Sequence, residues 1–443
     1  MTAAFLAPYP APFVAEVTIS TAWFVLGVIA LACMTVILYA AFFARGLKYK
    51  IEHPSWEDGD VEKFLCMVEA LTDSKLHRKT DIDVFTNGEN YYEAELEAIR
   101  NAQHSIHLEA YIFQQGKVAD RFVEALTQRA RSGVTVRMTA DALGSAGLTK
   151  SYLEPLRRAG GKVEWYHPFR IPKLPHYNNR THRELLIVDG KTAFLGGSGW
   201  ADHWLISTEK RKRWRDTMVR VRGDALSALQ AVFAENWLEA CGELLVGYPY
   251  FPAEESQNNT AALVVQSTPS AGGSTRARML FQLLLASASK SVHITTPYFL
   301  PDRSMSDELI RAMRERNVEV TILVPGAKSD HLLTRSSSRM AYGRLLKHGA
   351  RIFEYQPAMI HAKVLIIDGV WSVVGSTNFD NRSFGINDEV NLAVRDERLA
   401  ERLEQDFVRD LAHSREITLE TWRKRPVFER VPELLGWVLE RQE

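Results

Sequence analysis

The sequence predicts an α/β fold in which two similar α/β/α lobes share one active site across a pseudo-twofold axis, together with one N-terminal transmembrane helix. Two observations predict the paired lobes. His182 and Asp189 recur as His361 and Asp368, each 179 residues later, and strand-like and helix-like segments alternate in the same order through both halves. A third observation, an uncharged apolar run, predicts the membrane helix. The repeat is far too long for a solenoid, so one site built from two halves is the natural arrangement.

Composition places the chain among ordinary globular proteins and lowers the expectation of some functions. Of its 443 residues 46% are hydrophobic, and 54 Lys plus Arg balance 54 Asp plus Glu. Proteins that bind nucleic acid usually carry a basic excess, so no nucleic-acid partner is expected. Cys33, Cys66 and Cys241 are scattered without metal-ligand spacing. We expect neither a metal nor a cofactor.

The first expected element is a transmembrane helix over residues 22–44, a run of 23 residues without a charge. At about 1.5 Å per residue it would span roughly 34 Å, enough to cross a hydrocarbon core. A cleaved signal peptide is disfavoured because residues 1–17 contain no Lys or Arg. Arg45, Lys48 and Lys50 follow the run directly, which places the C-terminal bulk on the cytoplasmic side.

The rest of the chain divides by changes in pattern. With residues 1–50 as the anchor, we expect a connector at 51–80, a first lobe at 81–247, a linker at 248–262 and a second lobe at 263–443. In the first lobe, helices are expected at 90–102 and 119–132, and strands at 105–113 and 134–140. In the second lobe, helices are expected at 276–287 and 306–316, and strands at 291–296 and 318–324. The C-terminal amphipathic segment, 421–439, is either an interfacial helix or packed on its own lobe.

We expect the catalytic residues on and beside the strand that carries the repeated motif. Residues i and i+2 of a strand share a face, so His361 and Lys363 project together while Asp368 lies at the strand end. Small and polar residues follow in each half and suit a phosphate pocket, because Lys contributes charge and amide groups contribute hydrogen bonds. Those residues are Gly197, Ser198, Ser376 and Asn378.

Duplication predicts that His182 and His361 meet across one cleft. Two opposed imidazoles suit a two-step displacement, in which one attacks phosphorus and the other protonates the leaving alcohol and then activates the incoming alcohol or water. Glu109 and Asp141 lie at strand ends that should open toward the same cleft, and we expect them to support the site.

The two motifs carry a family resemblance. HAKVLIIDGVWSVVGSTNFDNRSF and HRELLIVDGKTAFLGGSGWADHW resemble the two HxKxxxxD motifs of the phospholipase D superfamily, and FTNGENYYEAELEAIRNAQHSIHLEAYIF, TTPYFLPD and the apolar N-terminus resemble its bacterial cardiolipin synthase branch. The resemblance extends from about Asp81 to the end of the chain. It implies a bilobal fold, a phosphohistidine intermediate and a place at the bacterial inner membrane.

The resemblance also implies a role for each motif residue. It makes His182 the nucleophile and His361 the general acid and base, and it makes Asp189 and Asp368 the residues that orient the two imidazoles.

The first motif departs from this pattern at two positions. Glu184 stands in place of the motif lysine, and Gly199 stands in place of Asn378. Because a carboxylate repels phosphate, we expect a cation to pair with Glu184. The candidate cations are Arg213, Arg215 and Lys363.

Two interpretations of this departure stay open. Either the half-site is remodelled, with Glu184 pairing a cation or binding a hydroxyl of the second substrate, or the first copy has decayed. The retained His182 and Asp189 favour remodelling.

The sequence therefore predicts a membrane-anchored phosphatidyltransferase that makes cardiolipin from phosphatidylglycerol and a second glycerophospholipid. Its expected partners are phospholipids and the bacterial membrane. The alternatives are a phospholipase D that hydrolyses the same bond, a nucleic-acid phosphodiesterase and a non-catalytic membrane scaffold with a relic site. Residue types alone do not decide between transfer and hydrolysis, identify the headgroups or predict the oligomeric state.

Overall fold

The computed structural model describes residues 21–43, 51, 60–169, 178–209, 211–247, 249–252, 258, 260–269, 275–330 and 332–426. The chain divides into two units, Met1–Arg45 and Gly46–Glu443, and each is described by itself.

The N-terminal unit contains helix α1 (Thr21–Phe43), which coincides with the predicted apolar run. Large apolar side chains are exposed along it, among them Trp23 and Phe24. Among the residues that the structure describes, no helix has both the length and the apolar character that crossing a membrane requires. The helix itself is confirmed, and its role as a membrane span stays a prediction.

The second unit is organised around one sheet of 15 strands. In sheet order the strands are β17 (Ser414–Ile417), β12 (Arg351–Tyr355), β11 (Glu319–Pro325), β9 (Ser291–Thr295), β13 (Val364–Ile367), β14 (Trp371–Gly375), β16 (Glu389–Arg395), β8 (Thr260–Ser267), β1 (Leu76–Thr86), β7 (Thr217–Gly223), β6 (Thr192–Gly196), β5 (Leu185–Val188), β2 (Ser105–Ala110), β3 (Thr135–Asp141) and β4 (Lys162–Tyr166). A second, two-stranded sheet pairs β10 (Phe299–Leu300) with β15 (Phe379–Asp380).

The strand order repeats outward from the centre of the large sheet. From β8 the second half runs β16, β14, β13, β9, β11 and β12, and from β1 the first half runs β7, β6, β5, β2, β3 and β4. The central strands β1 and β8 pair antiparallel, with Leu76 opposite Leu263. The predicted lobes are thus two halves of one continuous sheet, and β8 begins inside the segment 248–262 that was expected to be a linker.

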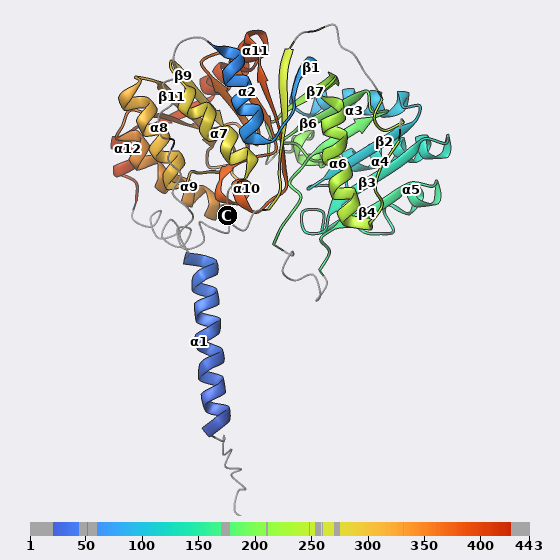
Figure 1. Cartoon of the computed structure of the whole chain (residues 1–443), viewed down its shortest axis with the longest axis horizontal. Coiled ribbons are helices and arrows are strands. Elements are labelled where there is room, and N and C mark those ends of the chain that lie inside the picture. Colours follow the sequence, from blue (N-terminus) through green and yellow to red (C-terminus); the bar gives the residue numbers. More distant parts are fainter. Residues whose placement is uncertain are drawn as a thin grey trace, which may run out of the picture. The chain divides into compact units, whose positions relative to one another are not determined.

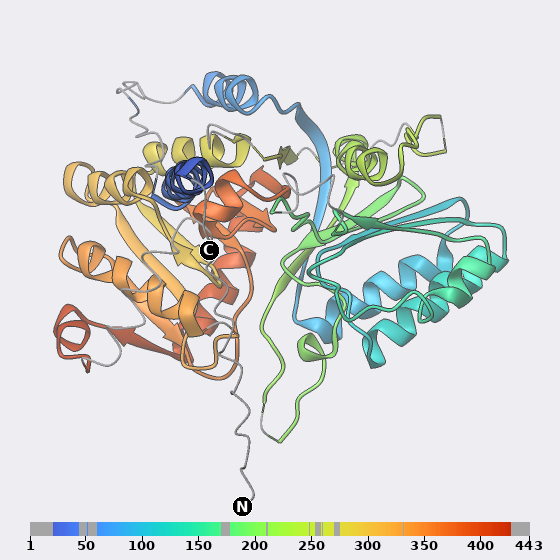
Figure 2. The ribbon, with the colours of Figure 1, turned by 90° about the horizontal axis from the view of Figure 1, so that it is seen from below.

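Helices cover both faces of the sheet, as the alternating pattern predicts (Figures 1 and 2). One face carries α6 (Leu226–Cys241) and α11 (Glu397–Ala412). The other face carries α3 (Gly88–Asn101), α4 (Lys117–Arg131) and α5 (Glu154–Arg158) over the first half, and α2 (Val61–Thr72), α7 (Arg276–Ser287), α8 (Arg303–Glu315) and α9 (Leu332–Leu346) over the second. Three further short helices lie among the described residues: η2 (Asp202–Trp204), α10 (Asn381–Gly385) and α12 (Leu419–Arg423).

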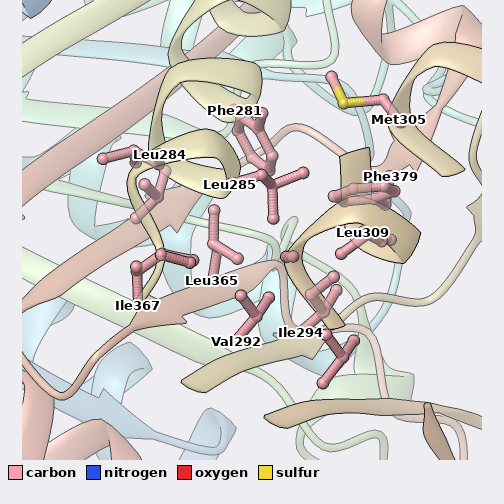
Figure 3. Packing of buried hydrophobic residues seen from close by; sticks show 14 of the residues in the cluster. Phe281, Leu284, Leu285, Val292, Ile294, Met305, Leu309, Leu365, Ile367 and Phe379 are labelled. Carbon is pink, nitrogen blue, oxygen red and sulfur yellow. The ribbon is translucent and has the colours of Figure 1, made fainter. Parts of the chain in front are cut away.

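The core under α7 shows how the strand and helix periods fit together. Phe281, Leu284 and Leu285 of α7 pack against β9 and against Leu365 and Ile367 of β13 (Figure 3). Leu365 and Ile367 alternate along the strand with Ile366, which faces the opposite core under α6 and α11. Burial on both faces therefore requires the continuous apolar run that precedes Asp368.

The regions around the two lobes differ from the sequence expectation in informative ways. The connector at 51–80 contains α2, whose Leu65 and Val68 belong to the core of the second half. At the C-terminus, Trp422 of α12 packs on the same core and its indole N–H donates to the carbonyl of Arg339. Trp422 thus packs on its own lobe, and residues 427–443 of the predicted amphipathic segment lie outside the described residues.

Candidate active site

The two motif histidines lie where the halves of the sheet cross-connect. His182 and His361 each lie three residues before a strand, β5 and β13, and so precede the strand on which the motif was expected to lie. The His182 N–H donates to the carbonyl of Asp388 in the second half, at 2.9 Å, and the His361 N–H donates to the carbonyl of Arg215 in the first half, at 2.7 Å. The backbone of each histidine is therefore fixed by the other half. Both histidines thus lie at the junction between the halves, and the meeting of their imidazoles across one cleft stays a prediction.

The imidazoles are held by the same crossed pattern. Nδ1 of His182 lies 3.1 Å from both carboxylate oxygens of Glu389, and Nδ1 of His361 lies 3.1 Å from Oδ2 of Asp216. Glu389 is the first residue of β16, and Asp216 directly precedes β7, the equivalent strand of the first half. A carboxylate at Nδ1 fixes the ring orientation and places the proton there, which leaves Nε2 as the reactive atom.

Burial is the largest influence on the charges of this junction. It would raise the pKa of Asp216, but the hydrogen bond and charge of His361, together with Lys363, hold that pKa below its ordinary value. Burial would also raise the pKa of Glu389, but His182 and the hydrogen bond from Ser376 outweigh it, so this pKa is lowered as well. Both orienting groups are therefore carboxylates at neutral pH.

His361 and Lys363 form a coupled pair in the second half. Nζ of Lys363 lies 2.9 Å from Nδ1 and 3.0 Å from Nε2 of His361. Burial and the charge of Lys363 lower the pKa of His361, while Asp216 opposes that effect. Burial also lowers the pKa of Lys363 to about 8, against the carboxylates of Asp216 and Glu389. The lysine is mainly charged at neutral pH and keeps the resting imidazole neutral.

Gly197 lies beside this pair, and Asn378 follows β14 with a buried polar atom that suits a ligand. Asn378 is buried, and its Oδ1 has no hydrogen-bond partner among the described residues. A Cβ at Gly197 would lie 2.8 Å from Oδ1 of Asp216 and 3.0 Å from Cδ of Lys363. Only glycine lets the two half-sites approach this closely, so the predicted glycine role is explained by the junction itself.

The two serines predicted to bind substrate are engaged with the protein. The Ser198 hydroxyl donates to the Gly199 carbonyl at 3.0 Å. The Ser376 hydroxyl donates to Glu389 and accepts the Val390 N–H. Ser376 thus positions the carboxylate that holds His182, and direct contact of either serine with substrate stays a prediction.

The expectation that the motif aspartates orient the imidazoles is wrong. Asp189 accepts the backbone N–H groups of residues 103–105, at 2.7 to 2.9 Å, where β2 begins. Asp368 does the same for residues 289–291, where β9 begins. Both adopt a positive φ, 54° and 57°, in the turn that closes each hairpin. These carboxylates lie at the opposite end of the strand from the histidines and tie each hairpin to its neighbour.

The expectation that a cation pairs with Glu184 is also wrong. Arg213 pairs with Glu89, Arg215 pairs with Asp410 at 2.9 Å, and Lys363 contacts His361.

Within the part of the chain that the structure describes, Glu184 makes no ion pair. Burial instead raises its pKa well above the ordinary value, against the opposing effects of the Ile112 N–H and of Lys363. Burial of a carboxyl group without an ion pair therefore disfavours its charged form.

Glu109 and Asp141 lie beneath the first half-site, as expected of supporting residues. Glu109 accepts the Thr181 hydroxyl at 2.5 Å and the Asn236 amide at 2.6 Å. Asp141 accepts the Thr181 N–H at 3.2 Å. Both therefore hold the residue that precedes His182, and a functional role for either remains a prediction.

Sequence reasoning missed the two orienting carboxylates and an aromatic wall around His361. Trp204 and Trp214 have ring centroids 5.5 and 5.4 Å from the His361 ring. The carboxylates had a signal: Asp216 and Glu389 each stand at the head of the strand that follows the motif hairpin in its half. The aromatic wall had none, because tryptophans are equally expected in a core.

Among the described residues, no group of three or more His, Cys, Asp and Glu side chains is arranged to hold a metal ion.

Comparison with known proteins agrees with this geometry. Residues 96–237 and 282–411 match the family described as cardiolipin synthase, PLD-like domain. Cardiolipin synthase 1 of Bacillus cereus is 33% identical over 363 residues, which cover 80% of this chain and 71% of that protein. A cardiolipin synthase of Staphylococcus aureus (strain Mu50) is 32% identical over 396 residues, covering 88% and 80%.

Solved structures show the same fold at low sequence identity. The phosphatidylserine synthase of Haemophilus influenzae Rd KW20 superposes with a TM-score of 0.62 and 14% identity, covering 86% of this chain and 97% of that one. A polyphosphate kinase from Porphyromonas gingivalis gives a TM-score of 0.52 at 14% identity, covering 81% and 53%.

The duplicated fold and its crossed histidines define a PLD-like protein. Within that class, the chain belongs to the cardiolipin synthase family.

Proposed function

We propose that the protein moves a phosphatidyl group from one phosphatidylglycerol to the glycerol hydroxyl of another glycerophospholipid, which yields cardiolipin and releases glycerol. The protein is a phosphatidyltransferase of the cardiolipin synthase type. The crossed arrangement carries the proposal, since each half supplies a histidine and the carboxylate that orients the histidine of the other half.

The first step of the proposed reaction forms a phosphohistidine. Nε2 of His182 attacks phosphorus while Glu389 holds the proton on Nδ1, and the bond from phosphorus to the leaving glycerol oxygen breaks. His361 gives its proton to that oxygen. The phosphodiester anion offsets the field of Lys363 and so raises the pKa of His361 from its lowered resting value, which favours the protonated acid that this step needs.

The second step reverses the roles of proton donor and acceptor. Neutral His361 takes the proton of the incoming hydroxyl, the oxygen attacks phosphorus, and the bond from phosphorus to Nε2 of His182 breaks. Lys363 and Asn378 bind the phosphoryl oxygens in both steps. Water in place of the lipid hydroxyl would give hydrolysis, so exclusion of water decides between transferase and phospholipase activity.

Labelled phosphatidylglycerol tests the function directly. Purified protein in detergent micelles should convert it to labelled cardiolipin, with phosphatidic acid as the minor product. With phosphorus label, wild-type protein should become covalently labelled and His182→Ala should not, while His361→Ala should slow the release of label. Phosphatidic acid as the main product, with a lipid alcohol in excess, would identify a phospholipase instead.

We further propose that α1 anchors the enzyme in the bacterial inner membrane with the catalytic unit on the cytoplasmic face. The uncharged run at 22–44 and the cations Arg45, Lys48 and Lys50 support this. Protein expressed in bacteria should stay with membranes after alkaline carbonate extraction, and removal of residues 1–50 should release it. Extraction of the full chain by carbonate would contradict an integral anchor.

A further inference from the structure

Glu184 is the polar group of the active site whose chemistry the reaction above leaves unassigned. Its side chain is 3% exposed. Oε1 accepts the Ile112 N–H at 3.0 Å, whereas Oε2 is buried and has no hydrogen-bond partner among the described residues. A buried carboxyl oxygen without a partner at a substrate site indicates a group that is completed by the ligand.

Gly199 makes this position of the carboxyl group possible. A Cβ at residue 199 would lie 2.4 Å from the Ile112 carbonyl oxygen and 2.9 Å from Oε1 of Glu184. The asparagine of the second half, Asn378, could not be accommodated at this point without displacing Glu184. The two departures from the motif are therefore one coordinated change, which a decayed site would not be expected to retain.

The charges around Glu184 favour its neutral form. Lys363 is the cation that acts on it, but the Nζ of Lys363 is in contact with His361. Burial is the largest cause that raises the pKa of Glu184, and Asp216 adds to it, against the backbone N–H groups of Ile112 and Tyr111. Because Oε1 already accepts an N–H, the proton of the acid belongs on Oε2.

We propose that Glu184 works as an uncharged carboxylic acid whose Oε2–H donates a hydrogen bond to a phosphoryl oxygen, in place of the motif lysine. The inference rests on the proposed function and refines its substrate class. Replacing one of two cations by a neutral donor lowers the positive charge at phosphorus by one. Such a site accepts a phosphodiester monoanion and discriminates against phosphomonoester and inorganic phosphate dianions.

Three substitutions separate the neutral donor from other roles. Glu184→Gln keeps a neutral donor of the same shape and should retain transfer within about threefold at pH 7, whereas Glu184→Met removes the donor and should lower kcat/KM by about 10- to 100-fold. Glu184→Lys should bind inorganic phosphate more tightly as a competitive inhibitor and should not raise transfer. Lipid transfer and phosphate inhibition are measured for all three, with circular dichroism to confirm folding.

Glu95 provides the matched control. It is equally buried in the first half, accepts the Trp200 N–H at 3.1 Å, and burial raises its pKa to about 8. It does not take part in the proposed reaction. Glu95→Gln should leave transfer, phosphate inhibition and the pH profile unchanged, so an effect of Glu184→Gln on them belongs to residue 184.

Infrared spectroscopy tests the protonation state without relying on activity. The difference spectrum between wild-type protein and Glu184→Gln at pH 7 should contain the carbonyl band of a protonated carboxylic acid. A carboxylate pair of bands in its place, or a Glu184→Gln protein as impaired as Glu184→Met, overturns the inference. If wild-type protein transfers no phosphatidyl group and yet shows the acid band, the proposed function fails while the neutral acid stands.

Discussion

The half-site at His182 and the half-site at His361 are built on equivalent hairpins and differ in their charge. In each, a histidine precedes the hairpin, and an aspartate closes its first strand with a positive φ. The position two residues after the histidine is a lysine in the second half and a buried glutamate, whose pKa burial raises, in the first. The duplicated backbone thus preserves the placement of side chains while leaving their charge free to change.

A second pair of equivalent histidines, His107 and His293, lies away from the active site and also differs in the charge of its surroundings. His107 stacks on Phe233 with ring centroids 4.8 Å apart, and His293 stacks on Phe407 at 4.7 Å. The partner of Nδ1 is neutral in the first half, Gln230 at 3.0 Å, and anionic in the second, Glu404 at 2.8 Å.

The second half thus carries a carboxylate where the first half has the neutral Gln230. The uncharged Glu184 proposed above would extend this division to the active site. Packing sets the geometry of the repeat, and local polarity then varies within it.

Loss of an orienting carboxylate should have the largest effect. Asp216→Asn and Glu389→Gln should each lower kcat by about 10²- to 10³-fold, because the imidazole loses its orientation and the stabilisation of its charged form. Equal losses would show that the crossed carboxylates serve the two halves alike, and steady-state transfer assays measure them.

The motif aspartates are the matched controls for those variants. Asp189→Asn and Asp368→Asn remove hydrogen bonds that tie the hairpins, and should cost about 2 to 4 kcal/mol of unfolding free energy while leaving kcat of the folded protein near wild type. A larger loss of kcat in Asp189→Asn than in Glu389→Gln would refute the crossed assignment.

We expect a pH-dependent effect of intermediate size on transfer from Lys363, which is present in the second half alone. The pKa of Lys363 is lowered to about 8, so the side chain is charged below that pH and loses its charge as the pH rises through it. Transfer measured as kcat/KM should fall above about pH 8 in wild-type protein. In Lys363→Arg the fall should move to higher pH, since arginine stays charged. Identical profiles for the two proteins would show that another group controls this limb.

The repeated histidines predict the smallest effect, on stability alone. Burial lowers the pKa of His107 to about 4, although Gln230 opposes it. The unfolded chain then binds more protons than the folded one as the pH falls below about 6.5. The protonation of His107 should therefore lower the free energy of unfolding by about 2 kcal/mol between pH 7 and pH 5. Gln230→Glu should reduce that loss by giving His107 the anion that His293 has.

Denaturant unfolding at both pH values measures this difference. Glu404→Gln is the mirror variant and should introduce an acid-dependent loss into the second half. An unchanged pH dependence in both variants would contradict the assignment to these histidines.

The sequence by itself determined the duplication, the α/β class and the positions of the two histidines. Helix α7 begins and ends at Arg276 and Ser287, as the pattern predicted, and β13 ends at Ile367, directly before Asp368, although it begins three residues later than His361. Local periodicity suffices here because these elements are buried along known faces, so hydrophobic spacing and element type are linked directly.

Only the tertiary structure decided which side chains meet. Asp216 and Asp189 are both acids near the end of a strand in the first half, and although Asp216 has an equivalent in Glu389, residue order does not tell which acid reaches an imidazole. The crossed hydrogen bonds depend on how the starts of β7 and β16 lie beside the opposite half. Asp216 and His361 are 145 residues apart in the sequence, and His182 and Glu389 are 207 residues apart.

The surroundings of Glu184 were likewise decided by the fold. A glutamate in a phosphate motif suggests a compensating cation as long as its surroundings are unknown. The folded chain engages Arg213 and Arg215 elsewhere and leaves Glu184 buried. Desolvation then acts on the carboxyl group more strongly than any available charge, and desolvation is a property of three-dimensional packing that residue order alone does not contain.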